Sequence, residues 1–371
     1  MPLQPALARE HYVDAEAWAY ERERVLFGSW FCVGRRANLG LDRPHRLAVV
    51  DVVGESVLVT SDADGALHGA YNVCSHRGAQ VVPVDPEGES PAPCPARSLR
   101  CPYHSWSYRL DGSLLKAPHT DDVPDFDAAE FGLRQVSTDT WGGFVFVHLN
   151  PSPPPLAQEM APFTSRLARY PLDRLVLGRR YRYDVRANWK VLAENYNECY
   201  HCGPVHPELA RLVPAFAGGG AAIDWDGGVP HRDGAWTFTM SGTTTRRPFP
   251  DLDEAERTRH KGELVYPNLW LSLAADHVAA FVLWPLGVDR TRVVCDLLFA
   301  PEEVNAADFD PDDAGELWDL VNTQDWAICA SVQRGMTSRA YRQGWFAPME
   351  DASADIRRWL LPRLAREAGD G

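Results

Sequence analysis

Two pairs of cysteine and histidine are the residues of this sequence best suited to hold a metal. Cys74 and His76 stand two apart in CSHRG, and Cys101 and His104 stand three apart in CPYHSW. Two thiolates and two imidazoles suit a structural zinc ion, but the spacing of the first pair is tighter than zinc fingers use. A two-iron cluster fits better, because each pair then gives its cysteine to one iron and its histidine to the other.

A second set of ligands lies further along the chain. His201 and His206, in NWKVLAENYNECYHCGPVH, would point about 140° apart on an unbroken helix. The Gly-Pro step between them is expected to break the helix and bring the two imidazoles together. Two histidines near a helix end also occur as caps or surface residues, and that alternative stays open from this stretch alone.

Asp325 completes this second set. It lies at the centre of an apolar stripe on the helix predicted for residues 313–338, and the stripe includes Ile328 and Val332. A carboxylate that faces a core must be paired or must bind a metal, so the alternative is a salt bridge to a buried arginine. With two imidazoles it forms the facial triad that binds non-haem Fe(II).

Short strand-like runs must position the first set of ligands. RLAVVDV, ESVLVTS and GGFVFVHLN are separated by turns, and two Asp-Gly pairs mark hairpins. Residues 14–28 have the pattern of an amphipathic helix, and the proline-rich PSPPPL indicates a domain boundary. We therefore expect an N-terminal helical segment over 1–29, an all-β domain over 30–152 and a second domain over 153–371.

The second domain mixes strands and helices. RRYRYDVRANWKV reads as a strand and LAENYNECYH as a helix after it, while YPNLWLSLAADHVAAFVLWPL and TRVVCDLLFAP read as antiparallel strands. The long helix follows them. The pattern predicts an α+β fold in which an antiparallel sheet grips a long C-terminal helix.

Composition limits the function classes. The chain of 371 residues has a net charge of −14, which argues against nucleic acid because phosphate contacts need Lys and Arg. No apolar run approaches the roughly 20 residues that span a bilayer. The N-terminus lacks the pattern of a signal peptide, so we expect a cytoplasmic protein whose eight cysteines are thiols or metal ligands.

Both ligand sets resemble those of one family. CSHRG followed by CPYHSW resembles the Rieske [2Fe-2S] motif, which implies that Cys74 and Cys101 bind one iron and that His76 and His104 bind the other. The stretch between the two pairs is longer than the family's usual spacing. It contains Cys94, which we leave unassigned.

NWK-x-x-x-EN-x-x-E-x-YH-x₄-H resembles the catalytic signature of Rieske non-haem iron oxygenases, in their terminal (alpha) subunit. The resemblance implies that His201, His206 and Asp325 hold mononuclear Fe(II), that Asn195 is catalytic, and that Glu198 bridges cluster and iron. The family's bridging residue is more often Asp. In that family the two centres of one subunit are too far apart for fast electron transfer, so the resemblance implies a homotrimer in which electrons pass between neighbours.

Within the family, stretches such as ENYNECYHCGPVHPEL most resemble the subgroup that acts on glycine betaine, carnitine or stachydrine. The implied reaction is O₂-dependent hydroxylation of an N-methyl group, with release of formaldehyde. The cation needs aromatic faces, for which Tyr196, Trp270, Phe281 and Trp284 are candidates, with core packing as the alternative.

Electrons must come from NAD(P)H through a separate flavin- or ferredoxin-type reductase, because the sequence has no dinucleotide-binding fingerprint. Two other functions stay open. The first is ring hydroxylation of an aromatic compound on the same scaffold, by a monooxygenase or dioxygenase reaction. The second is a zinc-stabilised ligand-binding protein without catalytic activity.

Overall fold

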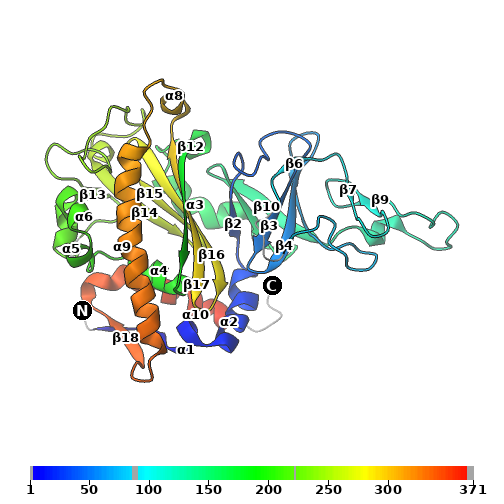
Figure 1. Ribbon diagram of the computed structural model, residues 1–371, viewed down its shortest axis with the longest axis horizontal. Helices are drawn as coiled ribbons and strands as arrows, with labels where there is room; N and C mark the ends of the chain where they lie inside the picture. The colour runs from blue at the N-terminus through cyan, green and yellow to red at the C-terminus, as the bar shows by residue number, and fades with distance from the viewer. Residues whose placement is uncertain (1–2, 86–90, 221–222, 366–371) are drawn as a thin grey trace. The chain divides into compact units, whose positions relative to one another are not determined.

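The computed structural model describes residues 3–85, 91–220 and 223–365 (Figure 1). The chain divides into two compact units: residues 26–160 form one, and the chain before residue 26 joins the chain after residue 160 in the other. The N-terminal helices therefore belong to the second unit instead of forming a segment of their own. None of the helices in the described part of the chain is long and apolar enough to cross a membrane.

The unit of residues 26–160 is built on β-structure, as expected. Its larger sheet has the strand order β2-β11-β10-β5-β4-β3-β6, and every neighbouring pair is antiparallel. The strands are β2 (Phe31–Arg35), β3 (Arg46–Val52), β4 (Glu55–Ser61), β5 (Leu67–Tyr71), β6 (Cys94–Pro95), β10 (Gln135–Trp141) and β11 (Phe144–His148). The helix α3 (Leu156–Arg166) follows the last of them.

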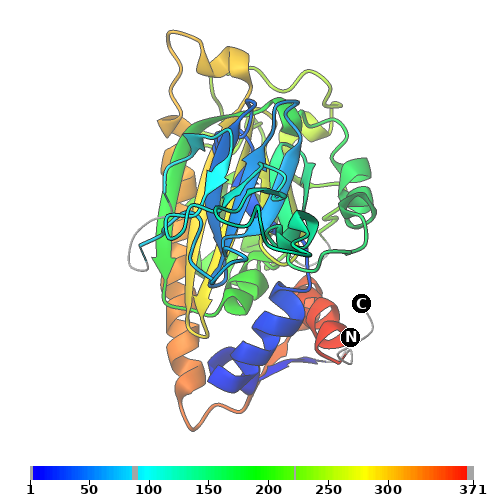
Figure 2. The same cartoon turned by 90° about the vertical axis from the view of Figure 1, so that its right-hand side faces the viewer.

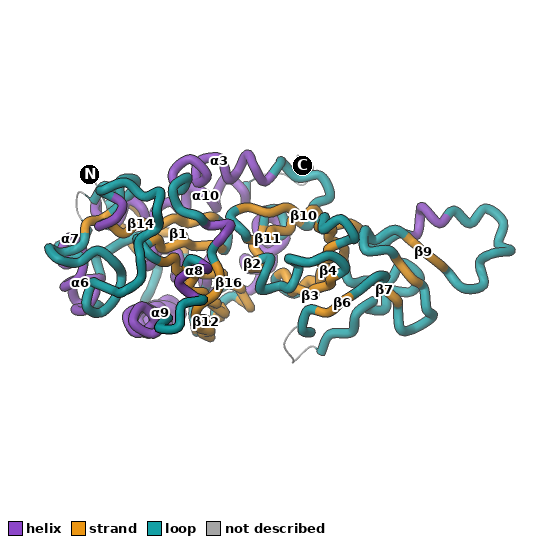
Figure 3. The backbone as a smooth tube through the Cα atoms, turned by 90° about the horizontal axis from the view of Figure 1, so that it is seen from above, coloured by secondary structure: helices purple, strands orange, loops and turns teal. Residues whose placement is uncertain are grey.

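A second, smaller sheet in this unit carries one of the ligand pairs. It consists of β7 (Leu99–Arg100), β8 (Ser107–Tyr108) and β9 (Leu114–Lys116), and Figure 3 shows β7 and β9 beyond the larger sheet. A buried cluster that includes Leu47 and Leu58 of the larger sheet and Leu99 and Tyr108 of the smaller one joins the two. Cys74 and Cys101 belong to the same cluster, so the two turns that carry the ligand pairs rest on a packed core.

The other unit is built on a six-stranded antiparallel sheet of order β12-β17-β16-β15-β14-β13. Its strands are β12 (Val176–Val185), β13 (Val229–Pro230), β14 (Arg259–Val265), β15 (Leu269–Leu273), β16 (His277–Gly287) and β17 (Arg290–Phe299). The long helix α9 (Asp312–Thr337) crosses it, as Figure 1 shows. This arrangement confirms the predicted α+β fold with a sheet that grips a long C-terminal helix.

Shorter helices surround this sheet. They are α4 (Trp189–Tyr196), α5 (Cys202–Val205), α6 (Pro207–Leu212), α7 (Pro214–Ala217), α8 (Pro301–Val304) and α10 (Asp355–Leu364). The N-terminal part adds β1 (Gln4–Ala8), α1 (Glu10–Val13) and α2 (Ala15–Glu21), and β1 pairs with β18 (Gln343–Phe346). Figure 2 shows α2 beside α10, where the hydroxyl of Tyr20 donates to the carbonyl of Leu364 at 3.1 Å.

The helix α9 does not bury the whole predicted stripe. Its buried face holds Trp318, Val321, Cys329 and Met336, whereas Ile328 and Val332 are exposed, the latter by 40%. Near the end of the helix Gln333 accepts a hydrogen bond from the backbone N–H of Asn188 and donates one to Tyr12. These contacts turn the Gln333 side of the helix towards the core.

A buried ion pair fastens the N-terminal part to α4. Glu21 at the end of α2 accepts hydrogen bonds from Trp189 Nε1 at 2.7 Å and from Lys190 Nζ at 2.7 and 2.9 Å. Glu21 and Lys190 are 1% and 0% exposed. Because two buried charges are stable only when they are paired, this contact fixes where α4 begins.

Candidate metal centres and cavity

The four ligands predicted for the cluster lie in two facing turns of residues 26–160. Cys74 and His76 follow β5, and Cys101 and His104 lie between β7 and β8. Both thiols are buried, whereas both imidazoles are exposed, with ring centroids 4.6 Å apart in an edge-to-face arrangement. The structure therefore brings together the four residues that the spacing singled out.

Tight backbone turns hold these residues in place. The N–H of Gly78 donates to the carbonyl of Cys74 at 2.9 Å, and the N–H of Ser105 donates to the carbonyl of Cys101 at 3.1 Å. Gly78 and Ser105 both have a positive φ, at 75° and 60°, so each turn closes through a left-handed residue. Trp106 stacks on the ring of His76 at 4.9 Å.

Tyr108 contacts the sulfur of Cys74. Its hydroxyl accepts a hydrogen bond from the N–H of Ser75 at 3.2 Å and lies 3.0 Å from Cys74 Sγ. Because the oxygen already accepts one bond, its own proton is free to point to the sulfur. Burial, followed by the contact with Cys74, raises the pKa of Tyr108. Two buried sulfurs beside two exposed imidazoles suit a cluster with one buried and one outward iron.

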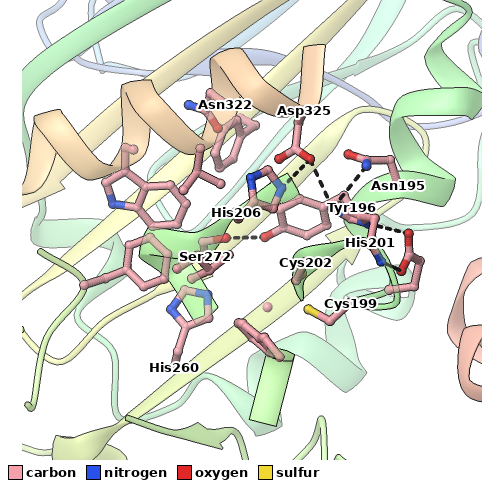
Figure 4. A pocket seen from close by; sticks show the side chains of 18 of the residues that line it. Asn195, Tyr196, Cys199, His201, Cys202, His206, His260, Ser272, Asn322 and Asp325 are labelled. Carbon is pink, nitrogen blue, oxygen red and sulfur yellow. Dashed lines mark hydrogen bonds and ion pairs between the residues drawn. The ribbon is translucent and has the colours of Figure 1, made fainter. Parts of the chain in front are cut away.

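The second ligand set also converges (Figure 4). Within the described residues, one donor atom each of His201, His206 and Asp325 lies within 4.8 Å of the others. Asp325 Oδ1 lies 2.9 Å from His206 Nε2 and 3.2 Å from His201 Nε2. Among the described residues, the ion partners of this carboxylate are the two imidazoles, not the arginine of the alternative interpretation.

The local helix differs from the prediction. The helix α4 ends at Tyr196, so Glu198 and His201 lie in the following turn and not on one continuous helix. The predicted break at the Gly-Pro step is wrong as well, since Pro204 lies inside α5 and the chain turns at His206. Pro204 is tolerated because the first turn of a helix needs no N–H donors.

Each imidazole has a further hydrogen-bond partner. His201 Nδ1 contacts Glu198 Oε1 at 2.5 Å, and His206 Nδ1 contacts Gln324 Oε1 at 2.7 Å. Carboxylate oxygens and amide oxygens are acceptors, so both Nδ1 atoms donate and both Nε2 atoms remain for a metal. Asn195 Nδ2 lies 3.3 Å from His201 Nε2, which places it at the edge of the same site.

The charges of the site suit a bound cation. Burial disfavours the charged form of His201, but hydrogen bonds to Asp325 and Glu198 outweigh it and raise its pKa to about 11. Burial would raise the pKa of Asp325, yet hydrogen bonds from His201 and His206 keep it below its usual range. The field that holds a proton among these side chains would also stabilise a divalent cation, so this donor set fits non-haem iron.

Comparisons with known proteins agree with both centres. Residues 172–366, more than half of the chain, match the family model described as "Ring hydroxylating alpha subunit (catalytic domain)", and residues 29–127 match "Rieske [2Fe-2S] domain". The chain is a Rieske oxygenase alpha subunit. Oxygenase chemistry excludes the alternative of a zinc-stabilised protein without catalytic activity, and the two domains imply a [2Fe-2S] cluster and a mononuclear iron.

Two relatives and one solved structure illustrate the comparison. The glycine betaine monooxygenase oxygenase subunit of Pseudomonas aeruginosa is 27% identical, over 98% of this chain and 90% of its own length. The carnitine monooxygenase oxygenase subunit of Acinetobacter pittii is 28% identical, over 89% and 85%. The crystal structure of the quaternary ammonium Rieske monooxygenase CntA with L-carnitine shares the fold, at 24% identity over 97% and 96% of the chains with a TM-score of 0.73.

A cavity of the oxygenase opens beside His201, His206 and Asp325. It holds about 720 Å³ of space, including its mouth. Its wall is rich in aromatic side chains: Tyr196, Phe216, Trp225, Phe238, Phe281, Trp318 and Trp326. Figure 4 shows Tyr196 between these three side chains and the far part of the cavity.

Two of the four aromatic residues predicted from the sequence line this cavity. Tyr196 and Phe281 do, whereas Trp270 and Trp284 are not among the lining residues. Trp270 is fully buried behind Tyr196, with ring centroids 4.9 Å apart. Sequence reasoning overlooked Trp318, although it lies on the same stripe of α9 as Asp325. Phe238 and Trp225 lie in irregular segments, where no periodicity marks them.

Short side chains in the sheet create the space. Gly262 on β14 lies opposite Ser272 on β15, which lies opposite Ala279 on β16. These three positions form one row across the sheet. Trp270 and Phe281 are paired in the next row on the same face, two residues further along each strand. Because α9 passes over the sheet, a row of small residues beneath it leaves a hollow that the large residues border.

Proposed function

We propose that this oxygenase hydroxylates an N-methyl group of a quaternary ammonium compound with O₂, so that the product releases formaldehyde and a tertiary amine. The observation that carries the proposal is the aromatic cavity beside the two-histidine, one-carboxylate site. Aromatic faces attract ammonium ions, by about 2 kcal/mol or more where the cation is desolvated. The two relatives named above are monooxygenases of glycine betaine and of carnitine, and both compounds are quaternary ammonium cations, which supports a substrate of this kind.

We assign the ligands as the sequence suggested. Cys74, His76, Cys101 and His104 would hold the [2Fe-2S] cluster, and the exposure of the two imidazoles supports an electron path through that side. The cluster supplies single electrons when it is bound. Tyr108 would tune it through its hydroxyl contact with the sulfur of Cys74.

The second centre would consist of His201, His206 and Asp325, and its iron supplies activation of O₂ when it is bound. Glu198 fixes the ring of His201 by accepting a hydrogen bond from its Nδ1–H, and Asn195 Nδ2 lies 3.3 Å from Nε2 of the same imidazole. The aromatic wall would hold the ammonium head near these ligands and exclude water. Tyr196 and Phe281 belong to that wall.

Electrons would reach the cluster from NAD(P)H through a separate reductase of flavin or ferredoxin type. Both relatives are named as oxygenase subunits, which supports a second component. We further propose a homotrimer in which Glu198 of one subunit receives electrons from the cluster of its neighbour. Residues 30–152 would then serve as the electron-transfer domain and residues 153–371 as the catalytic domain.

The test is a substrate panel with protein prepared anaerobically and a reconstituted reductase. Glycine betaine, carnitine, stachydrine and choline are compared with aromatic acids, and formaldehyde and O₂ uptake are both measured. Formaldehyde formed in step with O₂ uptake from an ammonium compound supports the proposal. Uptake of O₂ with an aromatic acid, and none with any ammonium compound, would instead show ring hydroxylation. The variant Asp325→Ala, which keeps the cluster ligands, is the control for turnover at the second centre.

A further inference from the structure

The polar groups of the cavity away from the metal ligands carry no positive charge. Among the described residues that line it, none is Lys or Arg. Tyr196 and Ser272 hydrogen-bond to each other, and Asn322 donates to the hydroxyl of Tyr183 at 3.3 Å. Two nitrogens of described lining residues are buried without a hydrogen-bond partner: Nδ1 of His260 and the indole Nε1 of Trp326, and both belong to neutral side chains. Trp326 directly follows Asp325, whereas His260 lies away from the metal site.

His260, on β14, is only 8% exposed, and its Nδ1 is buried without a hydrogen-bond partner. Its ring lies 4.7 Å from the ring of Phe238 and 6.0 Å from that of Trp318. Figure 4 shows it on the side of the cavity opposite Asp325. A buried polar group without a partner is costly, so its retention beside a cavity indicates a bound group that completes it.

The charge state of His260 limits what that group can be. Burial, and then the nearby His231 and His277, lower its pKa to about 3. The imidazole is therefore neutral, and it offers one N–H and one lone pair but no charge.

A neighbouring histidine is already committed. Trp318 Nε1 donates to His277 Nε2 at 2.9 Å, and His277 Nδ1 lies 3.0 Å from Asp276 Oδ1. Because an indole N–H can only donate, His277 must accept at Nε2 and donate from Nδ1 to Asp276. Asp276 in turn accepts from Arg246 at 2.8 Å, so this network fixes the Trp318 wall and leaves His277 without a nitrogen for a ligand.

The space next to the cavity offers no site for an anion either. A second hollow shares Tyr196 with the cavity, and its one basic lining residue among those described is Arg166. Arg166 makes two hydrogen bonds to Glu263, at 2.7 and 2.6 Å. Asp226 and Asp355 also line this hollow, so carboxylates outnumber cations there.

We propose that the cavity selects an N-methylated ammonium compound whose other end carries a neutral hydrogen-bonding group such as a hydroxyl, not a carboxylate, and that His260 is the residue that recognises this group. The inference rests on the proposed function and narrows its substrate class. A hydroxyl can pair with one nitrogen of a neutral imidazole. A carboxylate would be buried without a cationic partner, which strongly opposes binding. Glycine betaine and carnitine, the substrates named for the two relatives, both carry a carboxylate.

Three ligands with the same trimethylammonium head test this. Choline ends in a hydroxyl, glycine betaine in a carboxylate, and tetramethylammonium in a methyl group. Dissociation constants are measured by calorimetry on the anaerobic holoenzyme, and formaldehyde release is measured with the reductase. We expect choline to bind at least tenfold more tightly than glycine betaine and several-fold more tightly than tetramethylammonium.

Variants then locate the recognition. His260→Leu should weaken the binding of choline several-fold, to the level of tetramethylammonium, and should leave the binding of tetramethylammonium unchanged within twofold. His260→Gln, which keeps a neutral donor and acceptor, should restore part of the loss. His231→Leu is the matched control, because it removes a buried imidazole of the same region that is not among the cavity-lining residues.

The outcomes separate this inference from the proposed function. If wild-type protein binds glycine betaine as tightly as choline, the inference is wrong, and this result does not depend on whether His260→Leu folds. Formaldehyde release from glycine betaine would still support the proposed function. An unchanged preference for choline in folded His260→Leu also overturns the role of His260. If none of the three cations binds or is oxidised, the proposed function itself fails.

Discussion

Replacing Glu198 by alanine removes the acceptor that holds the ring of His201. The Glu198 carboxylate lies 2.5 Å from His201 Nδ1, and its second oxygen accepts the backbone N–H of His201 at 3.2 Å. A hydrogen bond to a charged group contributes about 1.5–3 kcal/mol. At about 1.4 kcal/mol per tenfold, its loss corresponds to a decrease in affinity for ferrous iron of roughly 10- to 150-fold. Removing the partner of a metal-ligating histidine typically has an effect of about 10- to 100-fold.

The assay has two parts. Anaerobic titration with ferrous iron gives the affinity of the mononuclear site. Single-turnover oxidation of the reduced cluster, with substrate and O₂ at saturating iron, then gives the coupling between the centres. We expect Glu198→Ala to keep both metals at saturating iron but to show little turnover.

Gln324→Leu is the matched control. It removes the partner of His206 Nδ1, a neutral amide at 2.7 Å. A neutral hydrogen bond contributes about 1 kcal/mol, so iron affinity should fall about fivefold while coupling is retained. Normal iron affinity and full turnover in Glu198→Ala would refute both roles of this carboxylate. If iron affinity is weakened but the centres remain fully coupled at saturating iron, Glu198 orients His201 but does not carry electrons between the cluster and the iron.

Three further predictions concern the surroundings of the two centres. Glu21→Gln leaves the Lys190 ammonium buried without its charged partner, so chemical denaturation should show that the free energy of unfolding falls by about 3–5 kcal/mol. The double variant Glu21→Met with Lys190→Met should recover most of this loss. A loss within experimental error would mean that the pair does not anchor α4. Tyr108→Phe removes a hydrogen bond of about 1 kcal/mol to the sulfur of Cys74. At about 59 mV per tenfold for one electron, the reduction potential of the cluster should fall by roughly 40 mV in a redox titration, and an unchanged potential would contradict the donor role of this hydroxyl. Burial raises the pKa of Glu194 to about 8, against the opposing contacts with Tyr12 and Lys190. The folded protein therefore binds more protons than the unfolded chain between pH 4.5 and 8, so its stability should decline as pH rises through this window, and Glu194→Gln should remove that part of the slope. A wild-type slope in the variant would show that Glu194 titrates normally.

The ligand types and their spacing could be predicted because they are local properties of the chain. A cysteine and a histidine two or three residues apart must share one turn, whatever the rest of the fold does. Short apolar runs likewise predict strands such as Arg46–Val52, and apolar residues at helical spacing predict the helix around Asp325. The α+β class follows from the order of these elements. The path from Tyr196 to His206 was predicted less well, since a one-turn helix has too few residues for a periodic pattern.

Only the tertiary structure decided which side chains face the cavity. Trp270 and Phe281 occupy the same row of the sheet, yet only Phe281 lines the cavity, because Tyr196 covers Trp270. The unpaired nitrogen of His260 is likewise invisible in the sequence, where it is one histidine in a strand. Its neutrality depends on burial and on histidines 231 and 277, which the sheet and its loops bring close in space. Burial and charge are properties of the packed fold, and the proposed selection of the substrate depends on both.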